Sequence, residues 1–257
     1  MLIADLPGAL ESRGTSSEQV IDVALSDDGK KLAAATQNGR VVLDREPLPT
    51  NDQQAPIALD LTFSPDGKTL AAGREDGTIV MWDAGSKKLI GRPMVAPGNE
   101  VRSISFSPDG KLLASASAVS AVRLWDVGKQ TVSGEPLQSN DRLISVDFSP
   151  DGRLLAAGSD NGDVVLFDVA SREPLGLALN AHAGSVFSVA FADDGKRLAS
   201  AGADGRVLLW DIQPWSDEDA LRARACERIG RNLTQSEWDQ ALPGKPYHRT
   251  CEQWPSD

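Results

Sequence analysis

The sequence predicts an all-β protein built from a repeated four-stranded unit, and two markers carry this prediction. The first is an Asp-Gly type turn, whose aspartates are Asp28, Asp66, Asp109, Asp151 and Asp194. The second is an aspartate that ends an apolar strand, at Asp44, Asp83, Asp126, Asp168 and Asp211. The two markers advance together, in steps of 38, 43, 42 and 43 residues and of 39, 43, 42 and 43 residues. Because a period of about 40–45 residues with four short strands is typical of a propeller blade, we expect five blades.

The stretch 185–211 shows the unit most clearly. It reads as three strands separated by the turns Asp194-Gly195 and Asp204-Gly205, in which glycine supplies the positive φ. Five or six residues lie between turn signals, which suits strands and is too short for helices. Segments between the units offer a short fourth strand, and their prolines Pro93, Pro136 and Pro174 suit an outer edge strand.

Three of the strand-ending markers are Trp-Asp pairs, at Trp82-Asp83, Trp125-Asp126 and Trp210-Asp211. With Phe167-Asp168 as a variant, the repeats over residues 20–211 resemble the WD-repeat family. The resemblance implies a β-propeller that acts as a non-enzymatic scaffold or sensor for protein partners. We therefore expect a lead-in over 1–19, propeller blades over 20–214 and a separate tail over 215–257.

Two features of the repeats predict how the blades pack. The second strand of each unit is rich in alanine, as at 33–35 and 71–72, so small side chains on one sheet leave room for large ones on the next. The first unit, 20–44, is one residue short and lacks the tryptophan, so we expect it to be the least regular blade.

The tail is predicted to be helical. Ser216 is placed to cap a helix that stops at Gly230, and 234–237 is a capping-box pattern opening a second short helix. Its apolar residues Leu221, Ile229, Trp238 and Leu242 favour packing on the propeller. The tail resembles the C-termini of bacterial multidomain WD-repeat signalling proteins. Cys226 and Cys251 are expected to be reduced thiols, with a disulfide as the alternative.

Composition narrows the classes of partner. Lys plus Arg number 26 against 37 Asp plus Glu, and the net charge of −11 argues against binding to nucleic acid or to anionic membranes. There is no run of 18 apolar residues, and the N-terminus lacks the basic region of a secretory signal, so we expect a cytoplasmic protein. With two histidines, two cysteines and no phosphate-binding glycine loop, we expect neither metal nor cofactor.

One constellation has the residue types of an acyl-transfer triad: Ser200, His182 and Asp204, with Trp210 close in sequence. No nucleophile elbow surrounds Ser200. In the WD-repeat family these positions form a buried hydrogen-bonded tetrad, so the resemblance implies a structural role. A propeller-based hydrolase is the alternative.

Partners are expected on the loops that precede the first strands, at 96–102, 139–144 and 181–187, with Arg102, Arg142 and Phe187 as candidate contacts. Seven blades of about 42 residues would need about 290 residues. Since only 211 residues precede the end of the last unit, we expect an incomplete ring that self-associates through open blade faces. The alternative to a scaffold is a truncated remnant of a larger signalling protein.

Overall fold

The computed structural model describes residues 19–50, 55–96, 100–117, 119–176, 178–212 and 234–235. In the described part of residues 19–212, every element of regular secondary structure is a β-strand, as the repeats predict. Apart from Gln19, Thr234 and Gln235, the predicted lead-in and the predicted helical tail with its two cysteines lie outside the described residues.

The strands form five antiparallel sheets, which we call blades 1 to 5 in chain order. Blade 1 contains β1 (Val20–Leu25), β2 (Leu32–Thr36), β3 (Val41–Leu43) and β4 (Glu46–Pro47). Blade 2 contains β5 (Ala58–Phe63), β6 (Thr69–Arg74), β7 (Thr78–Asp83) and β8 (Met94–Val95). Each strand pairs with its neighbour in sequence, from the first, inner strand outwards.

The remaining blades repeat this order. Blade 3 contains β9 (Ser103–Phe106), β10 (Leu112–Ala116), β11 (Ala121–Asp126), β12 (Thr131–Val132) and β13 (Leu137–Gln138). Blade 4 contains β14 (Leu143–Phe148), β15 (Leu154–Ser159), β16 (Asp163–Asp168) and β17 (Leu179–Asn180). Blade 5 contains β18 (Val186–Phe191), β19 (Arg197–Gly202) and β20 (Val207–Asp211), and no fourth strand lies within its described residues.

The outer edge of blades 2 to 4 is interrupted. In blade 3, β12 and β13 pair with opposite ends of β11. In blades 2 and 4 the first of the two pieces is a single bridge, Trp82 to Leu89 and Phe167 to Pro174. Between the two pieces the chain passes through a glycine with positive φ, at Gly91, Gly134 and Gly176, which bends it away from the sheet. The outer position predicted for the prolines is confirmed.

The turn aspartates organise the first hairpin of each blade. In blade 2, Asp66 Oδ1 accepts the hydroxyl of Ser64 at 2.7 Å and the backbone N–H of Lys68 at 3.0 Å. Blade 3 repeats the arrangement at Asp109, and both sets of hydrogen bonds hold the pKa of these carboxyls below its usual value. The prediction that these aspartates form turns is confirmed.

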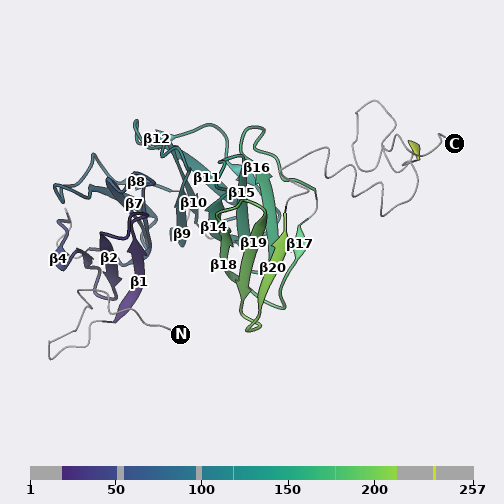
Figure 1. The fold of residues 1–257 in the computed structure, drawn as a ribbon, viewed down its shortest axis with the longest axis horizontal. Helices are drawn as coiled ribbons and strands as arrows, with labels where there is room; N and C mark the ends of the chain where they lie inside the picture. Colours follow the sequence, from purple (N-terminus) through teal and green to yellow (C-terminus); the bar gives the residue numbers. More distant parts are fainter. Residues whose placement is uncertain are drawn as a thin grey trace.

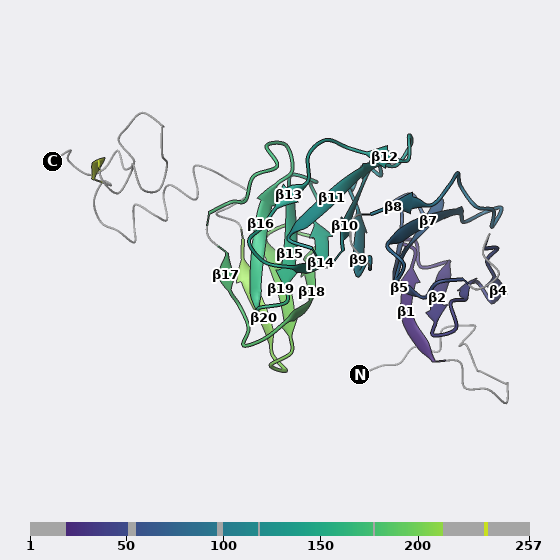
Figure 2. The same cartoon turned by 180° about the vertical axis from the view of Figure 1, so that it is seen from behind.

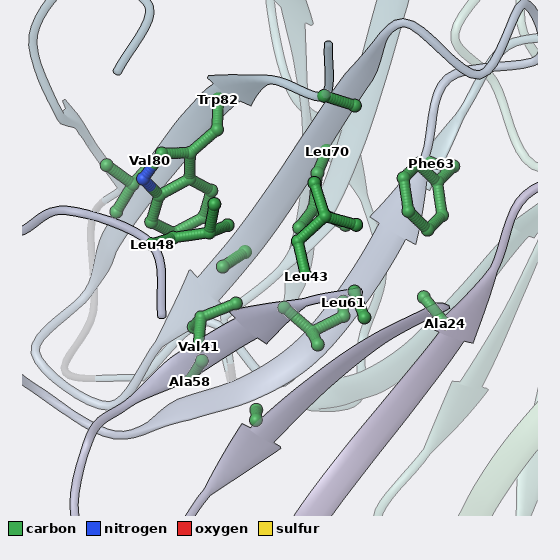
Figure 3. Packing of buried hydrophobic residues seen from close by; sticks show 14 residues of the cluster. Ala24, Val41, Leu43, Leu48, Ala58, Leu61, Phe63, Leu70, Val80 and Trp82 are labelled. Atoms are coloured by element: carbon green, nitrogen blue, oxygen red, sulfur yellow. The ribbon is translucent and has the colours of Figure 1, made fainter. Parts of the chain in front are cut away.

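Blades stack by fitting large side chains against small ones. We call the face of a blade that packs on the preceding blade its leading face, and the opposite one its trailing face. Figure 3 shows the leading face of blade 2, with Leu61, Phe63 and Trp82, against Ala24 and the β3 residues of blade 1. Trp82 is completely buried there, and the alanines of β2 supply the space. The predicted pairing of small with large side chains is confirmed.

Blade 1 is the least regular blade, as its missing residue predicts. Its third strand, β3, has three residues where the other blades have five or six. The chain leaves β3 through Asp44 and Arg45, which both have positive φ, at 48° and 71°. Non-glycine residues adopt this left-handed conformation at a cost, so the turn that closes this blade is strained.

The blades follow one another around an arc that does not close (Figures 1 and 2). The inner strands β1, β5, β9, β14 and β18 pack in chain order, and among the described residues no such packing joins β18 back to β1. Apolar side chains are exposed at both ends of the arc, including Val23 and Leu25 in blade 1 and Val207 and Leu209 in blade 5.

Polar side chains link the inner strands across blades. Asp22 Oδ2 accepts the backbone N–H of Leu61 at 2.7 Å, and Asp60 Oδ2 accepts that of Ile104 at 2.6 Å. Further along the arc, Asp147 Oδ2 accepts the N–H of Phe191 at 2.7 Å. Each inner strand is the edge of its sheet, so these bonds satisfy backbone groups that have no neighbouring strand.

Burial changes the titration of these inner carboxyls. Burial raises the pKa of Asp147 to about 6, although hydrogen bonds from the Phe191 N–H and the Ser105 hydroxyl act to lower it. Burial also raises the pKa of Asp60, and the nearby Asp22 carboxylate raises it further. In the folded protein these groups hold a proton to a higher pH than in the unfolded chain. The contribution of Asp147 to stability is therefore complete below about pH 4 and is lost as the pH rises through about 6.

We predict that Asp147→Asn stabilises the protein at pH 8, because it removes a buried charge and keeps an acceptor for Phe191. A rise from 3.8 to about 6 corresponds to at most about 3 kcal/mol of unfolding free energy at pH 8. The gain over the wild type should shrink towards pH 4. Urea unfolding of both proteins at pH 4.5, 6 and 8 measures it.

Asp109→Asn is the matched control. The pKa of the Asp109 carboxyl is lowered by hydrogen bonds from the Ser107 hydroxyl and the Lys111 N–H. The contribution of this carboxylate to the free energy of unfolding is therefore constant between pH 5 and 8 and is lost only in stronger acid. An Asp147→Asn effect of the same size at all three pH values would contradict the assignment.

Candidate functional site

The structure brings His182, Ser200, Asp204 and Trp210 together in blade 5. His182 Nε2 lies 2.9 Å from Ser200 Oγ, and His182 Nδ1 lies 2.9 Å from Asp204 Oδ1. Trp210 Nε1 donates to Ser200 Oγ at 2.9 Å. These contacts join the loop before β18, strands β19 and β20 and the turn between them into one hydrogen-bonded chain.

The donor and acceptor roles follow from the two ends of this chain, because the indole N–H of Trp210 can only donate and the carboxylate of Asp204 can only accept. Ser200 Oγ therefore accepts from Trp210, and its own O–H donates to His182 Nε2, the ring nitrogen that does not face Asp204. Nδ1 of His182 then carries the hydrogen and donates to Asp204, whose pKa is lowered chiefly by this bond. Asp204 also accepts the backbone N–H groups of Ala183 and Arg206.

Access separates this arrangement from a catalytic triad. The His182 side chain is 0% exposed and Ser200 is 1% exposed, so no substrate carbonyl reaches the serine oxygen. Gly202 faces the imidazole so closely that a Cβ there would lie 2.5 Å from His182 Cγ. The site therefore holds a loop in place, and the surrounding geometry leaves no room for an acyl group.

Other blades contain parts of the same arrangement. In blade 3, Trp125 Nε1 donates to Ser115 Oγ at 2.9 Å, but the repeat position of His182 before this blade is Pro97 in the sequence, and before blade 4 it is Ser139, so neither blade has the histidine. In blade 2, Trp82 Nε1 donates to the backbone oxygen of Pro49 instead. Blade 5 is the one blade with all four residues in the described part of the chain.

A cleft of about 390 Å³ lies where the inner strands of blades 2 to 5 begin. Side chains from all four blades line it: Leu59, Glu75, Glu100, Arg102, Ile144 and Phe187. Four of these occupy one repeat position, since 59, 102, 144 and 187 are spaced by 43, 42 and 43 residues. We call this the mouth cleft.

A bulge places these side chains at the mouth. In β5, β14 and β18 the pairing register shifts by one residue, and the extra residues are Leu59, Ile144 and Phe187. A bulged residue leaves the pleat and turns its side chain away from the sheet face. Phe187 is 65% exposed as a result, which is unusual for a phenylalanine and marks a surface available for contact.

Charges surround this apolar surface. Arg102 Nη2 forms an ion pair with Glu100 Oε2 at 2.6 Å, and Glu75 Oε1 accepts the backbone N–H of Ile57 at 3.1 Å. Two carboxylates and one guanidinium give the lining a net charge of −1. The cleft therefore combines an aliphatic and aromatic surface with an excess of negative charge.

The structure places two of the three predicted contact residues at the mouth cleft. Arg102 and Phe187 both line the mouth cleft, whereas Arg142 is not among its lining residues and lies 3.5 Å from the Asp160 carboxylate. Sequence reasoning missed Leu59 and Glu75, and it included Ile144 and Glu100 only as members of the predicted loops 139–144 and 96–102. From Phe187, the repeat spacing leads to Leu59 and Ile144.

Within the described residues, no cluster of three or more histidine, cysteine or acidic side chains has the arrangement of a metal site. A search of the same part of the chain for a helix long and apolar enough to span a membrane also finds none.

Comparison with known families identifies the repeats. The model of the WD domain, G-beta repeat, matches residues 49–83, 92–126, 130–168 and 173–211. These matches cover more than half of the chain, which therefore belongs to the WD-repeat family. They correspond to blades 2 to 5, and blade 1 is a fifth unit that the structure shows as a sheet of the same order. Comparison with curated proteins gives no match.

We predict that His182→Ala lowers the unfolding free energy by about 1–3 kcal/mol, because Ser200 loses its acceptor and Asp204 its principal donor in a buried network. Thermal melting measures the loss. Ser139→Ala, at the matching position before blade 4, is the control and should melt close to the wild type. Equal melting temperatures for His182→Ala and the wild type would refute the structural role.

Proposed function

We propose that this protein is a non-enzymatic scaffold that binds a protein segment in the mouth cleft. WD repeats in general mediate protein–protein interaction, and family membership supports that broad role here. The observation that carries the specific proposal is the convergence of four blades on one cleft through one repeat position, which is a bulged residue in β5, β14 and β18 and is Arg102, just before β9, in blade 3.

The lining suggests the chemistry of the partner. Leu59, Ile144 and Phe187 offer an apolar surface for an aliphatic or aromatic side chain. Glu75 keeps a carboxylate at the rim, while Glu100 is already paired with Arg102. A segment with one apolar anchor and a neighbouring lysine or arginine matches this pattern. The net charge of −11 supports a basic protein segment over nucleic acid as the partner.

The loops around the cleft suit binding with little rearrangement. The loop that leads to Phe187 is fixed by the tetrad at His182 and by Ser185, whose hydroxyl donates to the backbone oxygen of Asp160 at 2.9 Å. A contact surface held in this way loses less conformational entropy on binding.

We predict that selection from a random peptide library by the purified protein enriches an apolar residue next to a basic one. Phe187→Ala should weaken binding of the enriched peptides at least about tenfold, which is the range of an interface anchor. Glu75→Lys should weaken it through charge. Fluorescence anisotropy with a labelled peptide measures both.

Two controls match these variants. Val95→Ala removes an exposed apolar side chain, 71% accessible, from β8 at the outer edge, and Arg142→Glu reverses a charge outside the cleft. Both should bind as the wild type does. If Phe187→Ala binds the selected peptides with unchanged affinity, the mouth cleft is not the binding site.

A further inference from the structure

The two ends of the arc expose opposite faces of a blade. Blade 1 exposes its leading face, where Val23 and Leu25 are 57% and 52% accessible. Blade 5 exposes its trailing face, where Val207 and Leu209 are 69% and 72% accessible. Each pair continues across its sheet into smaller apolar residues, since Val23 faces Ala34, and Leu209 faces Ala199.

These exposed residues have buried counterparts inside the arc. Val23 and Leu25 correspond to Leu61 and Phe63 of blade 2, 38 residues later, which are 5% and 7% accessible. In the same way Val207 and Leu209 correspond to Val164 and Leu166 of blade 4, 43 residues earlier, which are 0% and 3% accessible. Inside the arc, the leading face of blade 2 packs on the trailing face of blade 1, and the leading face of blade 5 packs on the trailing face of blade 4.

The chain therefore carries both halves of one blade–blade interface without bringing them together. We propose that a second copy of this chain packs its blade 1 on blade 5 of the first, head to tail. The surface is heterologous, because the two faces that meet differ. In the assembly, the leading face of blade 1 in one copy is covered by the trailing face of blade 5 in another copy.

The hydrogen bonds between inner strands support this register. Asp22 and Asp60 accept the backbone N–H of Leu61 and Ile104 in the following blade. At the same repeat position blade 5 has Ser188, which is exposed, and the residue corresponding to Leu61 in blade 1 is Val23. Across the proposed interface the Ser188 hydroxyl would accept the N–H of Val23 from the second copy. Ser103 gives the precedent for a serine acceptor, since its Oγ accepts the N–H of Val146 at 3.2 Å, whereas Ser145 in blade 4 donates to the backbone oxygen of Val186 instead.

Blade number sets the form of the assembly. Two copies bring ten blades, and closed propellers have about four to eight. A head-to-tail pair therefore does not close into a ring, and it leaves one leading and one trailing face free. Association continues by addition of further copies, so the mean mass should rise with concentration.

Sedimentation velocity on the full chain from about 1 to 100 μM tests the proposal. The wild type should grow in mass with concentration. Leu25→Glu blocks the leading face and Leu209→Glu blocks the trailing face, so each variant alone should remain at 27.3 kDa. An equimolar mixture of the two should form a dimer of about 55 kDa and no larger species, because one intact face of each kind remains. Val95→Glu, on the exposed edge strand β8, should assemble as the wild type does.

Several results would overturn the proposal. A wild type that is monomeric at all these concentrations shows that the faces are covered within one chain or do not bind. A mixture of the two variants that stays monomeric, although the wild type assembles, excludes head-to-tail contact. Circular dichroism checks the fold of each variant, and Val23→Glu with Val207→Glu provides a second pair at exposed positions on the same two faces. Phe187→Ala leaves both faces intact and should assemble normally whether or not it binds peptide.

Discussion

The structure depends on the fit between a row of alanines on one blade and large side chains on the next. A single blade has two apolar faces and cannot cover either by itself, so it is stable only between neighbours. Trp82, Leu70 and Phe167 are completely buried by this stacking. Each such side chain contributes about 1.5–3 kcal/mol when taken out of water. The alanines matter equally, because a larger side chain in their place would push the neighbouring sheet away.

Stacking by faces leaves the inner strands as edges, and the protein satisfies them with side chains from the preceding blade. Carboxylates and hydroxyls both accept these backbone N–H groups, but with different bond lengths. The bonds to Asp22, Asp60 and Asp147 measure 2.6–2.7 Å, whereas those to Ser103 and Ser105 measure 3.2–3.3 Å. Charged acceptors bind the N–H more strongly, but burial penalises their charge, as the raised pKa of Asp147 shows. The serines avoid this penalty and hold the backbone less tightly.

The sequence was sufficient to predict what is encoded by one residue type at a fixed spacing. The turn aspartates and the alanine rows are of this kind, whereas the residues of the blade 5 tetrad were predicted from the resemblance to the WD-repeat family. The bulge in the inner strand is different, because Leu59, Ile144 and Phe187 share a position but no common chemistry, and a shift of register has no local sequence signature. Of the residues that line the mouth cleft, the sequence analysis therefore singled out only Arg102 and Phe187. The raised pKa of Asp147 likewise depends on the approach of other blades.

The position of the tetrad has a physical reason. Blade 5 packs on blade 4 through its leading face alone, so among the described residues it lacks the stacking that holds blades 2 to 4 on both sides. Hydrogen bonds within the blade compensate, since His182 and Asp204 tie the entry loop to the second and third strands. Blade 1 is the other end of the arc and has neither this network nor a tryptophan, and its third strand is the shortest of the five. These hydrogen bonds take the place of a neighbouring blade in holding blade 5 together. They also fix the loop that leads to Phe187, so this side of the mouth cleft is rigid.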